Sequence, residues 1–167
     1  MLKIEFNHAP ATEAIRRAIA ALEDPQPMHD EIGEYMIQAT RQRFLKGVAP
    51  DGTAWAPKSA GTLARYRRMG YGSLSRPLIG PGRALSRQIK KFVSRDGVVI
   101  GSALIYSAVM QHGARKGAFG STKGGLPIPF GDIPARPWLG VSDEDGRKIV
   151  EIADEYLAQQ LGEPGAG

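Results

Sequence analysis

The sequence predicts an α+β fold in which N-terminal helices and a long C-terminal helix pack on a small antiparallel sheet. Helical periodicity dominates both ends of the 167-residue chain, and a single hairpin signal lies between them. Loops rich in Gly and Pro separate these parts. Helices that are segregated from a hairpin are typical of α+β proteins, whereas a wound parallel sheet alternates the two.

Two helices are expected in the N-terminal part of the chain. Residues 11–22 place apolar side chains on one stripe, and Pro25 and Pro27 end this pattern. Residues 28–46 predict a second, longer helix that Gly47 ends, and the acids near its start and bases near its end suit the helix dipole. The stripes are formed by Ile15, Ala18, Ile19 and Leu22 in the first helix, and by Ile32, Tyr35, Met36 and Ala39 in the second.

A β-hairpin is expected in the middle of the chain. Asp96-Gly97, between two apolar runs, is a strong two-residue turn signal, which predicts strands at residues 87–94 and 98–102. The pattern of the first strand also fits a helix. Residues 59–69 predict a short helix before the hairpin, and residues 71–82, which are rich in Gly and Pro, predict a loop.

Beyond the hairpin, the chain is expected to hold two helices and a long loop. Residues 103–113 predict a short helix capped by Gly113, and the Gly-rich residues 114–125 predict a mobile loop. The final helix begins near Ser142 with an acidic first turn. Its inner side is expected to hold Ile149, Ile152, Ala153, Tyr156, Leu157 and Leu161. We expect one domain over residues 1–161 and a flexible tail at 162–167.

Catalytic, metal and cofactor chemistry finds no support in the sequence. The chain has no Cys, which excludes disulfides, thiolate metal sites and a thiolate nucleophile. Its three histidines, His8, His29 and His112, are not spaced as metal ligands are. The nucleophile elbow, the dinucleotide-binding pattern and the phosphate-binding loop are absent. We therefore expect no catalytic residue, no cofactor, no metal, and a protein that is not an enzyme.

Neither a membrane span nor a secretory signal is expected. The longest run without a charged side chain, residues 97–114, contains Ser, Gln and His and is too polar to cross a bilayer. The first ten residues lack the apolar segment of a signal peptide. The product is therefore expected to stay in the cytoplasm or to be assembled there.

Charge is distributed unevenly along the chain, although the net charge is only +5. Residues 52–95 contain ten Lys and Arg and no acid, whereas residues 143–163 contain seven acids and two bases. Three partners fit this split: nucleic acid, another protein, or a neighbouring copy of the same chain. The charged residues expected to make assembly contacts are Arg65, Arg67 and Arg68 in the basic part, and Glu144, Asp145 and Glu151 in the acidic part.

The two tryptophans both lie among turn residues. Trp55 is in the stretch PDGTAWAPK and Trp138 is in IPARPWLG. Pro, Asp and Gly favour tight backbone geometry, and Trp is a large apolar anchor with one N–H to satisfy. These loops are therefore expected to dock, either on the protein's own sheet or on a partner.

An ordered set of these motifs resembles one protein family. Arg43-Phe44 at a helix end is followed by PDGTAWAP, TLARY, PLIGPGRALSRQI, RDGVVIGS, IYSAVMQHG and IPARPWLG, before a final helix. This order is similar to that of the phage virion morphogenesis family, the tail-completion and head–tail joining proteins of Mu-like and related temperate tailed phages. The resemblance covers about residues 41–161. The chain departs from it by inserting Gly80-Pro81 and by exchanging Gln111 and His112, which favours a structural role for His112.

The resemblance implies a non-enzymatic structural protein of the virion. Such proteins act in tail completion and head–tail joining, at the neck or the head-proximal end of the tail. The implied partners are other copies of the chain in a ring, and phage neck, portal-side, and tail-tube or tail-terminator proteins. Packaged DNA in the channel is a further implied partner, and no membrane is involved. Trp55 and Trp138 join the six charged residues as expected assembly contacts.

An alternative from another class is a nucleic-acid-binding protein that uses the basic segment 58–95. Its bases can neutralise phosphates, which makes binding depend on salt. The segment has no helix-turn-helix pattern, no zinc finger and no strand rich in stacking aromatics.

Overall fold

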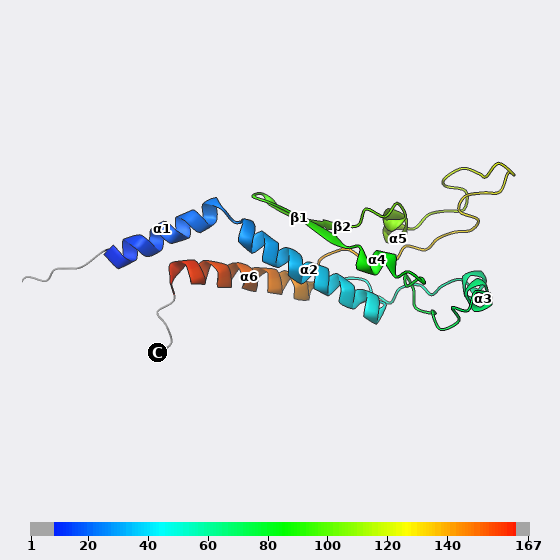
Figure 1. Cartoon of the computed structure of the whole chain (residues 1–167), viewed down its shortest axis with the longest axis horizontal. Helices are drawn as coiled ribbons and strands as arrows, with labels where there is room; N and C mark the ends of the chain where they lie inside the picture. Colours follow the sequence, from blue (N-terminus) through cyan, green and yellow to red (C-terminus); the bar gives the residue numbers. More distant parts are fainter. Residues whose placement is uncertain (1–8, 163–167) are drawn as a thin grey trace, which may run out of the picture.

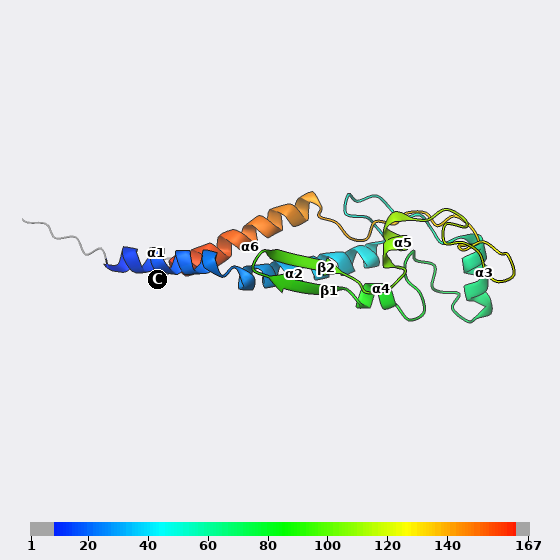
Figure 2. The same ribbon diagram turned by 90° about the horizontal axis from the view of Figure 1, so that it is seen from above.

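The computed structural model describes residues 9–162 of the chain as an elongated molecule (Figure 1). Long helices and a hairpin form one end and the middle, and loops with short helices form the other end (Figures 1 and 2). The predicted α+β class is confirmed. The elements are α1 (Ala9–Glu23), α2 (Gln26–Lys46), α3 (Ala60–Arg68), α4 (Ala84–Arg87), β1 (Lys90–Ser94), β2 (Gly97–Gly101), α5 (Ser107–His112) and α6 (Asp143–Leu161).

Helix α2 is the central element, because it packs against the β1–β2 hairpin and also against α6. Its side chains enter two apolar clusters. The first cluster joins α2 to α6 and the hairpin, and its buried members are Ile32, Met36 and Ile152. The second joins the C-terminal half of α2 to α4 and to the loops, and its buried members are Ile37, Phe44, Ala49, Trp55, Leu85, Ile89 and Trp138.

Helix α1 packs mainly on α6. Arg17 donates a hydrogen bond from Nε to the carbonyl of Gln160 at 3.0 Å, which places a cation at the C-terminal end of α6, where the dipole favours one. The apolar stripe predicted on α1 does not form a core, since Ile15, Ile19 and Leu22 are each more than half exposed. On α6, Ile152 is buried as predicted, but Leu161 is 48% exposed because it is the last residue of the helix.

The hairpin is present, but its predicted turn is wrong by one residue. Ser94 pairs with Gly97, so Arg95 and Asp96 form the turn, and Gly97 already belongs to β2. This register turns Val98 and Ile100 toward the apolar clusters and leaves Val99 exposed. A shift of one residue would exchange the two faces of each strand, so packing fixes the register more strongly than the turn signal does.

Two further boundaries differ from the prediction. Helix α2 begins at Gln26, with Pro27 in its first turn, where a proline is well tolerated. The acids predicted for the first turn therefore lie further along the helix, and no acid lies in that turn. Asp30 and Glu34 instead bind Lys91 of the hairpin, at 2.7 and 2.8 Å. Residues 87–89, predicted as strand, belong to α4 and the link that follows it.

Helix α5 is shorter than predicted, since it spans Ser107–His112, but Gly113 ends it as expected. Residues 114–133 then form an arm whose two sides are hydrogen bonded to each other. Ala114 and Ile133 exchange backbone hydrogen bonds at its base, and Phe119 donates to the carbonyl of Ile128 further out. The arm projects from the end of the molecule that also carries α3 (Figures 1 and 2). The expected loop is therefore paired, and its mobility stays a prediction.

Among residues 9–162, no helix combines the length and the apolar character that a membrane crossing requires. The flexible tail predicted at residues 162–167 falls, apart from Gly162, outside the described residues, and so does His8.

The close approach of α2 to the hairpin gives a test of this packing. A Cβ atom at Gly33 would lie 2.7 Å from Cδ of Lys91 and 2.9 Å from Cγ2 of Val98. We expect Gly33→Leu to lower the free energy of unfolding by about 1–3 kcal/mol, which is typical of an overpacked core. Gly61→Leu in α3 is the matched control, because a Cβ there meets nothing within 4 Å. Equal thermal stability of the two variants would contradict the packing.

Candidate functional site: a polar junction and the surfaces around it

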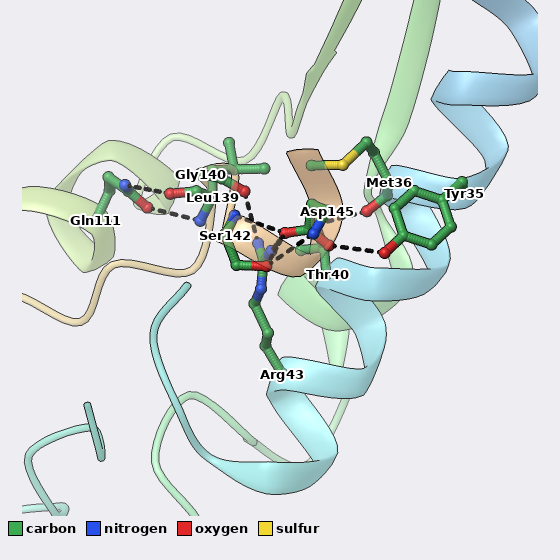
Figure 3. A network of polar contacts seen from close by, with 9 residues as sticks. All are labelled: Tyr35, Met36, Thr40, Arg43, Gln111, Leu139, Gly140, Ser142 and Asp145. Atoms are coloured by element: carbon green, nitrogen blue, oxygen red, sulfur yellow. Dashed lines mark hydrogen bonds and ion pairs between the residues drawn. The ribbon is translucent and has the colours of Figure 1, made fainter. Parts of the chain in front are cut away.

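A buried polar junction joins α2, the loop before α6, and α6 itself (Figure 3). Arg43 of α2 forms an ion pair with Asp145 of α6, and the two residues are only 7% and 3% exposed. The guanidinium also donates from Nη1 to the carbonyl of Gly140 at 2.8 Å. Asp145 accepts hydrogen bonds from the backbone N–H and the hydroxyl of Ser142, both at 2.7 Å, and from the hydroxyl of Tyr35 at 3.1 Å.

The local sequence explains why Asp145 lies at this position. Ser142 is the N-cap of α6, its hydroxyl accepts from the backbone N–H of Asp145, and the two residues form a capping box. The carboxylate therefore caps a helix and balances a buried arginine at once. The sequence predicts that Asp145 contacts a partner, whereas the side chain is buried by its own chain.

The junction shifts the acidity of two groups. Burial alone would raise the pKa of Asp145, but the two hydrogen bonds from Ser142, the Arg43 charge and the Tyr35 hydroxyl outweigh it, so this pKa lies below its ordinary value. Burial, reinforced by the hydrogen bond to Asp145, raises the pKa of Tyr35 to about 12. Near neutral pH, Asp145 is therefore ionised and Tyr35 is protonated, as the ion pair with Arg43 and the hydrogen bond between them require.

The two tryptophans pack around Phe44 of α2. The ring centroids of Trp55 and Trp138 lie 5.3 and 6.0 Å from that of Phe44. Trp55 donates from Nε1 to the carbonyl of Pro137 at 2.8 Å, and Trp138 donates to the carbonyl of Ser107 at 3.1 Å. The side chains are 5% and 1% exposed. These loops were expected to dock either on the protein's own sheet or on a partner. In the structure both tryptophans are buried inside the protein, where they pack on α2 rather than on the sheet.

Two polar side chains that were not among the predicted contact residues hold the Trp138 loop. Gln111 accepts from the backbone N–H groups of Trp138 and Leu139 at 2.9 and 3.0 Å. Arg136, only 8% exposed, donates to the carbonyls of Ala56 and Pro57 at 2.7 and 2.9 Å and so ties this loop to the Trp55 loop. Arg136 lies between two prolines and close to Trp138, in a loop that was expected to dock. This position was the sequence signal that its side chain is buried.

The charged surfaces lie at different parts of the long axis. Arg65, Arg67 and Arg68 form the exposed last turn of α3, at the end of the molecule that carries the arm (Figures 1 and 2). They make no ion pair with any described residue. Helix α6 begins nearer the middle with exposed Glu144, and Glu151 is bound to Lys148 on the same helix at 2.7 Å. The structure therefore separates the basic and acidic surfaces in space.

A groove of about 910 Å³ lies over the junction, between α2, the loop at residues 48–52 and the start of α6. Apolar side chains of the loop and of Val141, which is 62% exposed, line part of it. Asp51, Asp143 and Glu144 line another part. Within the described part of the chain, no group of three or more His, Asp or Glu side chains is arranged to hold a metal ion.

Comparison with known proteins identifies the class to which this fold and sequence belong. The model of the phage virion morphogenesis family matches residues 6–158, so the chain belongs to that family. The chain is also similar to the putative capsid assembly protein G of Escherichia phage Mu, with 29% identity over 127 residues that cover 75% of each chain. No solved structure matches. The family resemblance seen in the sequence is thus confirmed, and with it a structural or assembly role in a phage.

The Arg43–Asp145 pair predicts a dependence of stability on pH. At pH 7, Asp145→Asn would leave Arg43 buried without a counter-ion, at a cost of about 3–5 kcal/mol in the free energy of unfolding. Because folding lowers the pKa of Asp145, its contribution is fully present above the ordinary carboxyl pKa of about 4. It is lost as the pH falls from there through the lower pKa of the folded state.

Denaturant unfolding of both proteins across a pH series, followed by Trp fluorescence, measures this contribution. The difference between wild type and Asp145→Asn should be large at pH 7 and should shrink below pH 4. Glu144→Gln, at an exposed neighbouring acid, is the matched control and should lower the free energy of unfolding at pH 7 by no more than about 1 kcal/mol, the size of a helix-dipole contribution. A difference between wild type and Asp145→Asn that stays constant with pH would contradict the role given to the ion pair.

Proposed function

We propose that the chain is a non-enzymatic structural protein of a tailed-phage virion that acts in tail completion and head–tail joining. It assembles in the host cytoplasm and works at the neck, as a ring of copies that contacts portal-side proteins and tail-tube or tail-terminator proteins. Membership in the virion morphogenesis family supports an assembly role. The elongated shape, with long helices at one end and α3 with the arm at the other, suits a subunit that bridges neighbours (Figure 1).

The separation of charge along the molecule carries this proposal. Exposed Arg65, Arg67 and Arg68 lie at one end, and exposed Glu144 lies at the start of α6. When the basic surface of one copy meets the acidic surface of the next, the contact joins unlike surfaces, and such contacts form a ring when the rotation between copies closes. Exposed ion pairs contribute only about 0–1 kcal/mol each, so they set orientation rather than affinity.

The nucleic-acid-binding alternative uses the same bases and differs in what they face. Not all of the basic segment 58–95 is available for it. Lys58 donates to the carbonyl of Ile79 at 2.6 Å, and Lys91 is bound by the acids of α2. The exposed arginines of α3 favour this alternative in one form, in which they line a channel and face DNA phosphates.

Charge reversal distinguishes the two uses of these arginines. In a phage that lacks its own copy of the gene, we expect the Arg65→Glu, Arg67→Glu, Arg68→Glu variant to support few joined particles. Losing several ion pairs and gaining repulsion weakens association by about tenfold or more, since 1.4 kcal/mol corresponds to a factor of ten. Adding Glu144→Lys and Glu151→Lys should restore joining in part. Asp145 is left unchanged, because it holds Arg43.

The matched control is Lys90→Glu with Arg95→Glu, which reverses exposed bases of the hairpin away from α3. This control should support joining like wild type. Electron microscopy counts the joined particles for each variant. Normal joining by the α3 variant, together with loss of DNA retention or ejection, would contradict the ring contact and favour the channel-lining alternative.

A further inference from the structure

The arm formed by residues 114–133 exposes several large apolar side chains that do not pack against the rest of the protein. Phe130 is 67% exposed, Phe119 and Leu126 are each 56% exposed, and Ile128 is 37% exposed. Phe119 and Ile128 are neighbours, because the backbone N–H of Phe119 donates to the carbonyl of Ile128 at 2.7 Å. Exposed apolar side chains that gather on one projecting segment mark an interaction site, and aromatic side chains are frequent anchors of such sites.

The arm is also basic, and its two sides are hydrogen bonded to each other. It carries three bases, Arg115, Lys116 and Lys123, against the single acid Asp132. Asp132 accepts a hydrogen bond from the backbone N–H of Lys116 at 2.7 Å, which ties the two sides together. Thr122 accepts from the backbone N–H of Leu126 and so closes the tip. An arm that is paired in the free chain loses less conformational entropy when it docks.

The groove over the α2–α6 junction has the complementary character. Arg43 and Asp145 neutralise each other. The other charged residues that line the groove are the acids Asp51, Asp143 and Glu144 and the base Lys46, so the groove has an excess of two negative charges. Val48, Pro50 and Val141 supply apolar surface beside them. Its volume of about 910 Å³ is large enough for several side chains. No residue of the arm lines it, so the arm of the same chain leaves the groove open.

We infer that the arm of one copy docks in the α2–α6 groove of a second copy. The excess of two positive charges on the arm matches the excess of two negative charges around the groove, and both surfaces combine charge with apolar side chains. The arm and α3 project from the same end of the molecule (Figures 1 and 2). This inference rests on the proposed ring and names the apolar contact that gives it affinity.

A disulfide between copies tests this contact directly, because the chain has no Cys of its own. Gly124→Cys places one thiol at the arm tip, and Gln42→Cys places the other on the exposed side of α2 that lines the groove. Oxidised glutathione should then produce a ladder of linked dimers, trimers and larger species that dithiothreitol reverses. The matched control pairs Gly124→Cys with Ala103→Cys, which is exposed but does not line the groove, and should give no ladder.

Sedimentation velocity over a concentration series gives an independent measurement of the same contact. Phe119→Ser with Phe130→Ser should weaken self-association by about tenfold or more, since both remove aromatic anchors. Ile105→Ser removes a side chain that is 96% exposed and lies outside the arm and the groove, and should associate like wild type. The arm variants should unfold at the wild-type temperature, because neither phenylalanine belongs to the apolar clusters.

The outcomes separate this inference from the proposed function. A ladder from the groove pair together with weakened association of the phenylalanine variant supports the arm contact. If the phenylalanine variant associates like wild type, the arm contact is overturned. The ring proposal is not, because it is then supported by the charged surfaces alone. A wild-type chain that stays monomeric at every concentration, together with no ladder from the Gly124→Cys, Gln42→Cys variant in purified particles, overturns both.

Discussion

The ion pair between Arg43 and Asp145 is the interaction on which the arrangement of the molecule depends. A single carboxylate caps α6, neutralises a buried arginine of α2 and accepts the hydroxyl of Tyr35. The same arginine holds the carbonyl of Gly140, at the end of the loop that carries Trp138. Because a buried charge without its partner is strongly destabilising, the ion pair couples the packing of α2, this loop and α6. Helix α1 is positioned by its packing on α6, and the hairpin is positioned by its packing on α2.

This rigid core explains how the functional surfaces are presented. The two tryptophan loops pack on Phe44 of α2, and the hydrogen bonds of Arg136 join one loop to the other. Together they support the end of the molecule that carries α3 and the arm. From that end project α3 with its arginines and the arm with its exposed phenylalanines. A subunit with a stable core and projecting, unlike surfaces is suited to assembly with copies of itself and with other virion proteins. Self-association through unlike surfaces is the feature that a closed ring requires.

Much of the local structure was predictable because its causes are local. Periodicity predicted the long helices, Ser142 predicted the start of α6, and Gly47 and Gly113 predicted helix ends. The hairpin was predicted, but its register was not, because packing of Val98 and Ile100 against α2 and α6 decides it. The charge split was visible in the sequence. The sequence did not show which of these charged side chains are available to a partner, because Asp145, Lys58 and Lys91 bind residues far along the chain. The roles of Gln111 and Arg136 depend on the same kind of distant contact.

The direct test of head–tail joining is electron microscopy of lysates from a phage that carries this gene, with the gene deleted. We predict DNA-filled heads beside complete tails that are not attached to them, and a plasmid copy of the wild-type gene should restore joined particles. Heads that fail to form, or particles that are joined as in the intact phage, would contradict a role in joining heads to tails.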